Sequence, residues 1–201
     1  MSNKNWPGFL AAGIGTAAAG IGLALHHKKQ KEASEEAVIF GLICPMEEET
    51  TPFREAMDIT ETTRLSGLTF YKGTLDGQTV VLSQCGVGKV NAAVCAEILC
   101  EHFQISYLIN IGVAGTTHEG IKQGDIVIGN DAVQHDMDVT CRGYRPGEVP
   151  DMFVSYFLAD DDLIALAEQA AKNCELDGAA VHTGRIASGT NLSAAGNKPI
   201  K

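Results

Sequence analysis

The chain has 201 residues, of which 45% are hydrophobic and 20% charged, a balance typical of a folded globular protein rather than a disordered one. Its formal net charge of −10 argues against a nucleic-acid partner, because the phosphate backbone would be repelled. The six cysteines are scattered without a Cys-x-x-Cys pair, so neither a structural zinc site nor a disulfide framework is predicted, and a reducing compartment is favoured.

Residues 1–36 read as a separate leader. The run 9–25 carries no charge, and a basic cluster, His26-His27-Lys28-Lys29, follows it. The run is at the short limit for a membrane span. A cleaved signal peptide, an uncleaved anchor and an unanchored leader all fit it. We favour the anchor, in which the basic cluster would keep the following domain in the cytoplasm.

The globular domain is expected over residues 37–201. The apolar, β-branched run 37–44 predicts a buried strand that Pro45 ends, and a helix is expected over 50–57. Three carboxylates, Glu47, Glu48 and Glu49, lie between them. Acids are favoured in a first helical turn, so a solvated helix start explains them. Alternatively, the strand end aims one carboxylate into a crevice, where ligands bind in open α/β sheets.

Downstream, Asp76-Gly77 between two β-rich runs predicts a hairpin of strands 68–75 and 79–83. The spacing of Val90, Val94 and Ile98 predicts a helix over 89–103 that turns these three side chains to the core. Further strands are expected over 107–111, 126–128 and 179–186, and a helix over 160–174. Strands with interleaved helices and one hairpin indicate an α/β fold, a three-layer sandwich with a mixed central sheet.

Several of these strands lead into short motifs. In chain order the motifs are Pro45-Met46-Glu47-Glu48-Glu49, Gly86-Val87-Gly88, Gly112-Val113-Ala114-Gly115, Gly124-Asp125 and His135-Asp136-Met137-Asp138. In this order and spacing they resemble the methylthioadenosine/S-adenosylhomocysteine nucleosidases of the nucleoside phosphorylase superfamily, over residues 38–189. The resemblance implies a phosphorylase/hydrolase-like fold, no cofactor and a homodimer. It also implies hydrolysis of the N-glycosidic bond of either nucleoside with release of adenine, as in methionine salvage.

The resemblance also implies roles for individual residues. Glu49, the third Glu of its run, would activate the attacking water, and one group of residues would line the nucleoside pocket: Val87, Val113, Gly115, Leu192 and Ser193. Leu192 stands where the family has an aromatic residue that stacks on adenine. A second group would reach into the pocket of the partner subunit: Val139, Arg142 and Pro150. The family has an apolar aromatic residue where this chain has Arg142.

Two other activities compete with hydrolysis. A purine nucleoside phosphorylase would grip phosphate with an arginine near the Gly112–Gly115 turn, but no basic residue lies over 107–117. A non-catalytic nucleoside-binding module would not need a water-activating Glu49. The His135–Asp138 run is also compatible with metal ligands, although no other cluster completes a coordination shell, and no metal is expected.

The end of the chain departs from the family pattern. Ser188-Gly189-Thr190 stands where the family has Ser-Gly-Asp, and the last residues are loop-like without a closing helix. The resemblance implies a Met-Glu pair for the ribose hydroxyls and an Asp that protonates adenine, both beyond Lys201. We therefore expect a domain truncated at its C-terminus, with impaired activity.

Overall fold

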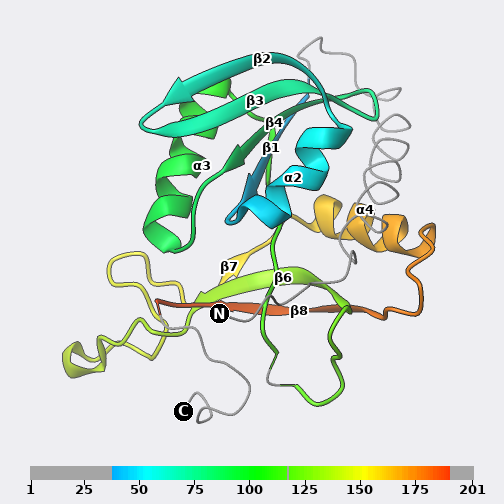
Figure 1. Ribbon diagram of the computed structural model, residues 1–201. Coiled ribbons are helices and arrows are strands. Elements are labelled where there is room, and N and C mark those ends of the chain that lie inside the picture. The colour runs from blue at the N-terminus through cyan, green and yellow to red at the C-terminus, as the bar shows by residue number, and fades with distance from the viewer. Residues whose placement is uncertain (1–37, 117, 191–201) are drawn as a thin grey trace, which may run out of the picture. The chain divides into compact units, whose positions relative to one another are not determined.

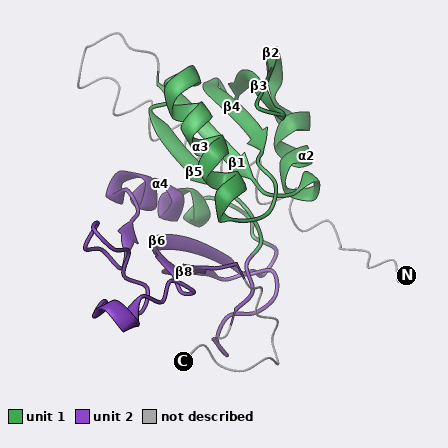
Figure 2. Cartoon of the chain, turned by 90° about the vertical axis from the view of Figure 1, so that its left-hand side faces the viewer, with its two compact units in different colours: residues 1–113, 170–176 green, residues 114–169, 177–201 purple. Residues whose placement is uncertain are grey.

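The computed structural model describes residues 38–116 and 118–190, which form two compact units (Figure 1, Figure 2). Unit 1 comprises the described residues up to Val113 together with 170–176, and unit 2 comprises 114–169 and 177–190. The predicted leader 1–36, with its apolar run 9–25, lies outside the described residues. Within the described ranges, no helix is long and apolar enough to cross a membrane.

Unit 1 is built on a five-stranded sheet in the order β2-β3-β4-β1-β5 (Figure 2). Its central strand β1 (Ile39–Cys44) runs parallel to both β4 (Gln78–Gln84) and β5 (Tyr107–Asn110). By contrast, β3 (Leu68–Leu75) is antiparallel to β4 and to β2 (Asp58–Leu65). The predicted mixed sheet is therefore confirmed. So is the hairpin, since Asp76 and Gly77 take the positive φ values of 48° and 76° that a two-residue type I′ turn needs.

Two helices cover opposite faces of this sheet. Cys95 and Leu99 of α3 (Lys89–Phe103) belong to a buried cluster with side chains from one face, Ile43, Phe70 and Val81. On the other face, Arg54 of α2 (Glu47–Ala56) lies over the ring of Tyr71, with Cζ 5.8 Å from the ring centroid. Helix, sheet and helix thus form the predicted three layers within unit 1, and the α/β fold class is confirmed.

The prediction for α3 is right in its bounds and only partly right in its face: Ile98 packs against the core cluster as predicted, whereas Val90 and Val94 do not. The side chains of Val90 and Val94 are 78% and 45% exposed, whereas Cys95 and Leu99 are fully buried. Apolar residues occur all round this helix, so spacing alone does not identify the face that the sheet will cover. The consequence is an apolar stripe on the outside of unit 1, at the N-terminal half of α3.

The edge strand β2 is the main element that the sequence did not predict. Its residues, Asp58–Leu65, are mostly polar and exposed, because the strand is held by main-chain pairing with β3 rather than by burial. In addition, α2 begins at Glu47, three residues before the expected start, so all three glutamates lie inside its first turn.

Unit 2 contains a three-stranded sheet in the order β7-β6-β8. The long strand β6 (Ile126–Gln134) is parallel to β8 (Val181–Ser188) and antiparallel to the short β7 (Phe157–Leu158). A 3-10 turn, η1 (Thr140–Arg142), follows β6, and α4 (Asp161–Lys172) begins in unit 2 and ends in unit 1. The expected strand at 126–128 is therefore much longer than predicted.

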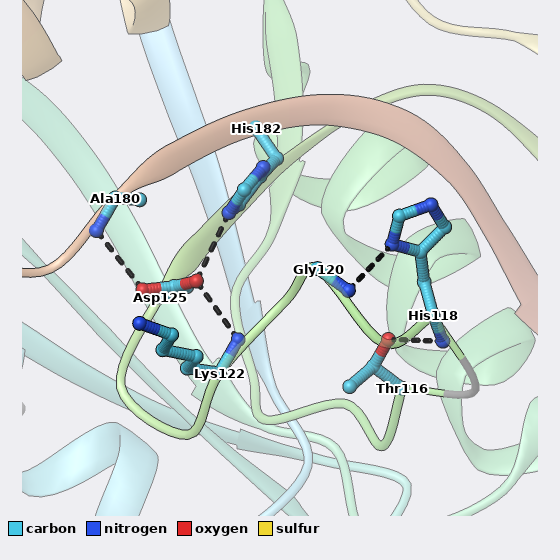
Figure 3. A network of polar contacts seen from close by, with 7 residues as sticks. All are labelled: Thr116, His118, Gly120, Lys122, Asp125, Ala180 and His182. Atoms are coloured by element: carbon cyan, nitrogen blue, oxygen red, sulfur yellow. Dashed lines mark hydrogen bonds and ion pairs between the residues drawn. The ribbon is translucent and has the colours of Figure 1, made fainter.

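Asp125 joins the starts of β6 and β8 (Figure 3). Its carboxylate accepts hydrogen bonds from the backbone N–H groups of Lys122 and Ala180, both at 2.9 Å, and lies 3.0 Å from Nε2 of His182. These contacts, led by the two backbone N–H groups, lower the pKa of Asp125 from 3.8 to about 2.

Candidate active site

Three neighbouring strand ends define the site in unit 1. Because β1, β4 and β5 are parallel, their carboxyl ends meet at one edge of the sheet. Each end leads into one of the predicted motifs, which carry Glu49, Val87 and Val113. In open α/β sheets this is the edge where ligands bind. The fold therefore gathers these three residues, which are distant in sequence, at the expected place.

Glu49 is the buried carboxylate of this edge, with only 1% of its surface exposed. Its Oε2 accepts a hydrogen bond at 2.9 Å from the backbone N–H of Met46, and its Oε1 accepts one at 2.8 Å from the backbone N–H of Val113. The first contact is half of a capping box, with Glu49 at the third position of α2 and Met46 as the N-cap. Both oxygens are thus oriented by backbone donors, and each retains a lone pair for a water molecule.

Glu47 and Glu48 have different surroundings. Glu48 is exposed, and Glu47 forms an ion pair with Arg54 at 2.8 Å that, with a hydrogen bond from Thr51, lowers the pKa of Glu47. With Arg54, Glu47 lines a polar pocket of about 180 Å³ that Glu49 does not line. Glu47 and Glu48 therefore make the solvated helix start that one interpretation predicts, whereas Glu49 is buried.

Gly112 is a site residue that sequence reasoning missed. A Cβ atom at this position would lie 3.1 Å from Oε1 of Glu49 and 3.4 Å from Cδ of Pro45. A side chain there would compete with the carboxylate for space. The only signal in the sequence is a glycine directly after the β5 run, which conformational preference alone also explains.

The turn after β4 presents an apolar side chain at this edge. Gly86 and Gly88 have φ values of 84° and 107°, which L-residues rarely adopt. Nδ2 of Asn91 donates a hydrogen bond to the carbonyl oxygen of Val87 at 2.8 Å. Val87 is 61% exposed and Val113 is 50% exposed. Exposed valines beside a buried carboxylate suit the apolar part of a ligand.

Three buried thiols lie behind the site: Cys44, Cys85 and Cys95. Burial is the main cause that raises the pKa of Cys44 to about 12 and that of Cys85 to about 11. Both groups are therefore neutral thiols at physiological pH and do not act as nucleophiles.

The remaining predicted site residues lie elsewhere or outside the described ranges. Gly115 is exposed at the beginning of unit 2, and Leu192 and Ser193 are outside the described residues. Three more belong to unit 2 and follow β6: Val139, Arg142 and Pro150. The carbonyl of Val139 accepts the backbone N–H of Arg142 at 2.9 Å, and Arg142 is exposed.

In the part of the chain that the structure describes, no group of three or more His, Cys, Asp or Glu residues is arranged to hold a metal ion. The two aspartates of the His135–Asp138 run accept hydrogen bonds from threonines. Asp138 accepts hydrogen bonds from both the backbone N–H and the hydroxyl of Thr140, which lower its pKa. Asp136 accepts two from Thr190.

Comparison with known proteins identifies the family of the chain. The family model described as the phosphorylase superfamily matches residues 39–195, and the chain belongs to this family. Its relatives include the 5'-methylthioadenosine/S-adenosylhomocysteine nucleosidase of Geobacillus kaustophilus, 43% identical over 75% of this chain and 63% of the relative. That of Bacillus subtilis is 39% identical over 75% of this chain and 64% of the relative. The resemblance inferred from the sequence is confirmed.

Solved structures of such nucleosidases share the fold. The enzyme of Neisseria meningitidis, in complex with methylthio-immucillin-A, superposes with a TM-score of 0.72 at 38% identity, over 76% of this chain and 65% of that one. The enzyme of Colwellia psychrerythraea, in complex with adenine, gives 0.72 at 35% identity, over 79% and 64%. The chain thus spans a little under two thirds of the length of these relatives.

Proposed function

We propose that this chain is part of an adenosine-thioether nucleosidase, which hydrolyses the N-glycosidic bond of 5'-methylthioadenosine or S-adenosylhomocysteine and releases adenine. One observation carries the proposal: Glu49 is buried at the ligand edge of the sheet with both carboxylate oxygens oriented by backbone N–H groups. The proposed reaction is further supported by relatives that are named as such nucleosidases and are about 40% identical to this chain.

In the proposed reaction, Glu49 acts as the general base. A water molecule attacks the anomeric carbon of the ribose and gives a proton to the Glu49 carboxylate. The bond from this carbon to the purine nitrogen breaks, its electron pair leaves with adenine, and an acid must protonate the purine. In the family that the chain resembles, an Asp supplies this proton. A positioned base contributes about 10²–10⁴-fold to such a step.

Hydrolysis is favoured over phosphorolysis because the segment that follows β5 carries no basic residue. The segment from β5 to the end of the Gly112–Gly115 turn contains no Lys or Arg that would neutralise a bound phosphate. An unpaired phosphate in a protein pocket is costly. A phosphorylase is therefore the second candidate, with a non-catalytic nucleoside-binding module as the third.

The test is adenine release from each nucleoside, with and without phosphate. Glu49→Gln should lower the rate at least a hundredfold, whereas Glu48→Gln, the same change at the exposed neighbour, should leave it unchanged. Dependence on phosphate would identify a phosphorylase. Nucleoside binding in calorimetry without turnover, equally strong in Glu49→Gln, would identify a binding module and overturn the proposal.

We also propose that two copies of the chain form a homodimer. In each copy, Val87, Val113, Gly115, Leu192 and Ser193 would line the nucleoside pocket, and the partner would contribute Val139, Arg142 and Pro150. The apolar stripe of α3, formed by Val90 and Val94, offers an apolar surface that a second copy could cover.

Arg142 would then bias the choice of substrate. An arginine that reaches the thioether end of the pocket can pair with the carboxylate of the homocysteine tail, and the methylthio group offers no such partner. We therefore propose S-adenosylhomocysteine as the preferred substrate. The exposure of Arg142 leaves its guanidinium accessible for such a contact.

Membrane anchoring through residues 9–25, with the domain on the cytoplasmic side, is also a proposal. It rests on the apolar run and the basic cluster behind it. Recovery of the full chain in the membrane fraction, and of a variant starting at residue 37 in the supernatant, would support it. Equal partition of both would overturn it.

A further inference from the structure

Helix α2, whose first turn carries Glu49, begins at a residue that is a poor helix cap. The N-cap is Met46, whose side chain lacks the oxygen atom with which Ser, Thr, Asp or Asn would accept a first-turn N–H. The first N–H groups of a helix have no backbone partner within the helix. An acceptor from another segment of the chain would therefore stabilise this turn.

Gln84, the last residue of β4, supplies such an acceptor. In the amide orientation that satisfies both partners, its side-chain oxygen accepts the backbone N–H of Glu47 at 3.2 Å, and its side-chain nitrogen donates to Oε2 of Glu47 at 2.7 Å. The second contact ends on a carboxylate, which makes it the stronger of the two. This reciprocal pair ties the first residue of α2 to the end of β4.

The other carboxylate oxygen of Glu47 is held within α2 itself. Oε1 forms an ion pair with Nη2 of Arg54 at 2.8 Å and accepts the hydroxyl of Thr51 at 3.1 Å. The Arg54 guanidinium lies in turn over the ring of Tyr71 on β3. The Glu47 side chain is therefore held from two directions, by its own helix on one oxygen and by β4 on the other.

We propose that Gln84 is a positioning residue for the hydrolysis and acts through the first turn of α2. This rests on the proposed function, in which Glu49 is the base. Glu49 lies two residues after Glu47, and its carboxylate is held by the N–H groups of Met46 and Val113. Because Val113 belongs to another segment, a shift of the turn changes its contact with Glu49. A misplacement of about 1 Å can lower a rate about a hundredfold.

The surroundings of Gln84 allow substitutions there without overpacking. Gln84 is half-buried and lines the polar pocket of about 180 Å³. Three titratable side chains line the same pocket: Glu47 and Arg54 from α2, and Tyr71 from β3. A new side chain at position 84 can therefore extend into this space, and its effect on the rate reports the loss of the two hydrogen bonds.

Gln84→Met keeps the length of the side chain and removes both hydrogen bonds. We expect kcat for adenine release to fall about tenfold with KM changed less than about twofold, because the base moves while the proposed pocket residues remain. The amide hydrogen of Val113, followed by NMR, should exchange faster, although β1 separates the strands that lead to the two residues. Gln78→Met, the same change at the other end of β4, is the control and should alter neither quantity.

Gln84→Glu adds a readout that depends on pH. Its carboxylate would repel that of Glu47 at neutral pH, whereas protonation of one of the two restores a donor between them. The ratio of its kcat to that of the wild type should therefore rise as the pH falls from about 8 to about 5. The same ratio for Gln84→Met should stay constant, since methionine does not titrate. Division by the wild-type rate removes the titrations that all three proteins share.

The outcomes separate this inference from the proposed function. If the wild type releases adenine and Gln84→Met leaves either kcat or the exchange of Val113 unchanged, the role of Gln84 is overturned and the proposed function stands. Equal losses in Gln78→Met would indicate general destabilisation of β4, and a flat ratio for Gln84→Glu would remove the contact with Glu47. Either result also overturns the inference. If the wild type releases no adenine, the proposed function and the role of Gln84 in it both fail, while the exchange of Val113 still shows whether Gln84 orients Glu49.

Discussion

Oε1 of Glu49 accepts a hydrogen bond from the backbone N–H of Val113 at 2.8 Å, and this contact ties the first turn of α2 to the residues that follow β5. It joins two motifs that are 64 residues apart in sequence. Because a second backbone donor, Met46, holds Oε2, the carboxylate has one orientation at the sheet edge. Its position is therefore sensitive to small changes in either segment.

Gly112→Ala should displace this carboxylate. The new Cβ would lie 3.1 Å from Oε1 of Glu49, so Glu49 or the β5 end must shift. We expect adenine release to fall at least tenfold and the free energy of unfolding to fall by about 1–3 kcal/mol, the usual range for overpacking. Gly184→Ala is the control, because its Cβ meets no atom within 4 Å. Equal behaviour of the two variants in both measurements would contradict the expectation.

The buried thiols should be protected from alkylation and disulfide reagents in the native protein. Burial raises the pKa of Cys44 to about 12 and that of Cys85 to about 11, so neither supplies thiolate at pH 8. The exposed thiols of Cys100 and Cys141 should react first and act as internal controls. Mass spectrometry after iodoacetamide treatment, with and without denaturant, measures this directly. Modification of Cys44 at the rate of Cys100 in the folded protein would disprove it.

Unit 2 should lose stability in acid, because Asp125 becomes protonated there. Its folded-state pKa of about 2 lies below the ordinary value of 3.8, so its ionised form stabilises the fold above about pH 4. This contribution is lost as the pH falls from about 4 through 2. Unfolding midpoints measured over pH 2–5 should fall steeply for the wild type and less steeply for Asp125→Asn. Parallel curves would show that the contacts drawn in Figure 3 do not govern this titration.

Charges on the apolar stripe of α3 should prevent self-association. Val90→Glu combined with Val94→Glu places two carboxylates at positions that are exposed within one copy of the chain, so folding should persist while a dimer dissociates. Sedimentation velocity and circular dichroism measure the two effects. Ile59→Glu, at another exposed apolar position of unit 1, is the control and should leave the oligomeric state unchanged. A wild type that is monomeric at high concentration would overturn the proposed dimer.

Arg142→Phe should shift the substrate preference. Removal of the guanidinium eliminates a partner for the homocysteine carboxylate and restores an apolar wall for a methylthio group. The ratio of kcat/KM for S-adenosylhomocysteine to that for methylthioadenosine should drop by about tenfold, the loss expected for one charge-assisted hydrogen bond. Arg145→Phe, three residues further along the same exposed segment, is the control. An unchanged ratio in Arg142→Phe would remove Arg142 from the pocket.

Much of this protein could be derived from local patterns in its sequence. The apolar run that became β1, the Asp76-Gly77 hairpin and the bounds of α3 follow from hydrophobicity and turn chemistry that act within a few residues. The order of the glycine and glutamate motifs was sufficient to identify the family, which the comparisons confirm. These features depend on neighbours in the chain, so they can be recognised without the fold.

Other features were decided only by tertiary structure, because they depend on which distant segments meet. Three successive glutamates have the same charge and similar propensities, but the β5 end supplies a donor only to Glu49. Val90 and Cys95 are both apolar, and the position of the sheet buried one and exposed the other. Asp136 and Thr190 are 54 residues apart, and the parallel pairing of β6 with β8 brings them together. Sequence thus determined the local elements and the family, whereas long-range packing selected the residues that can do chemistry.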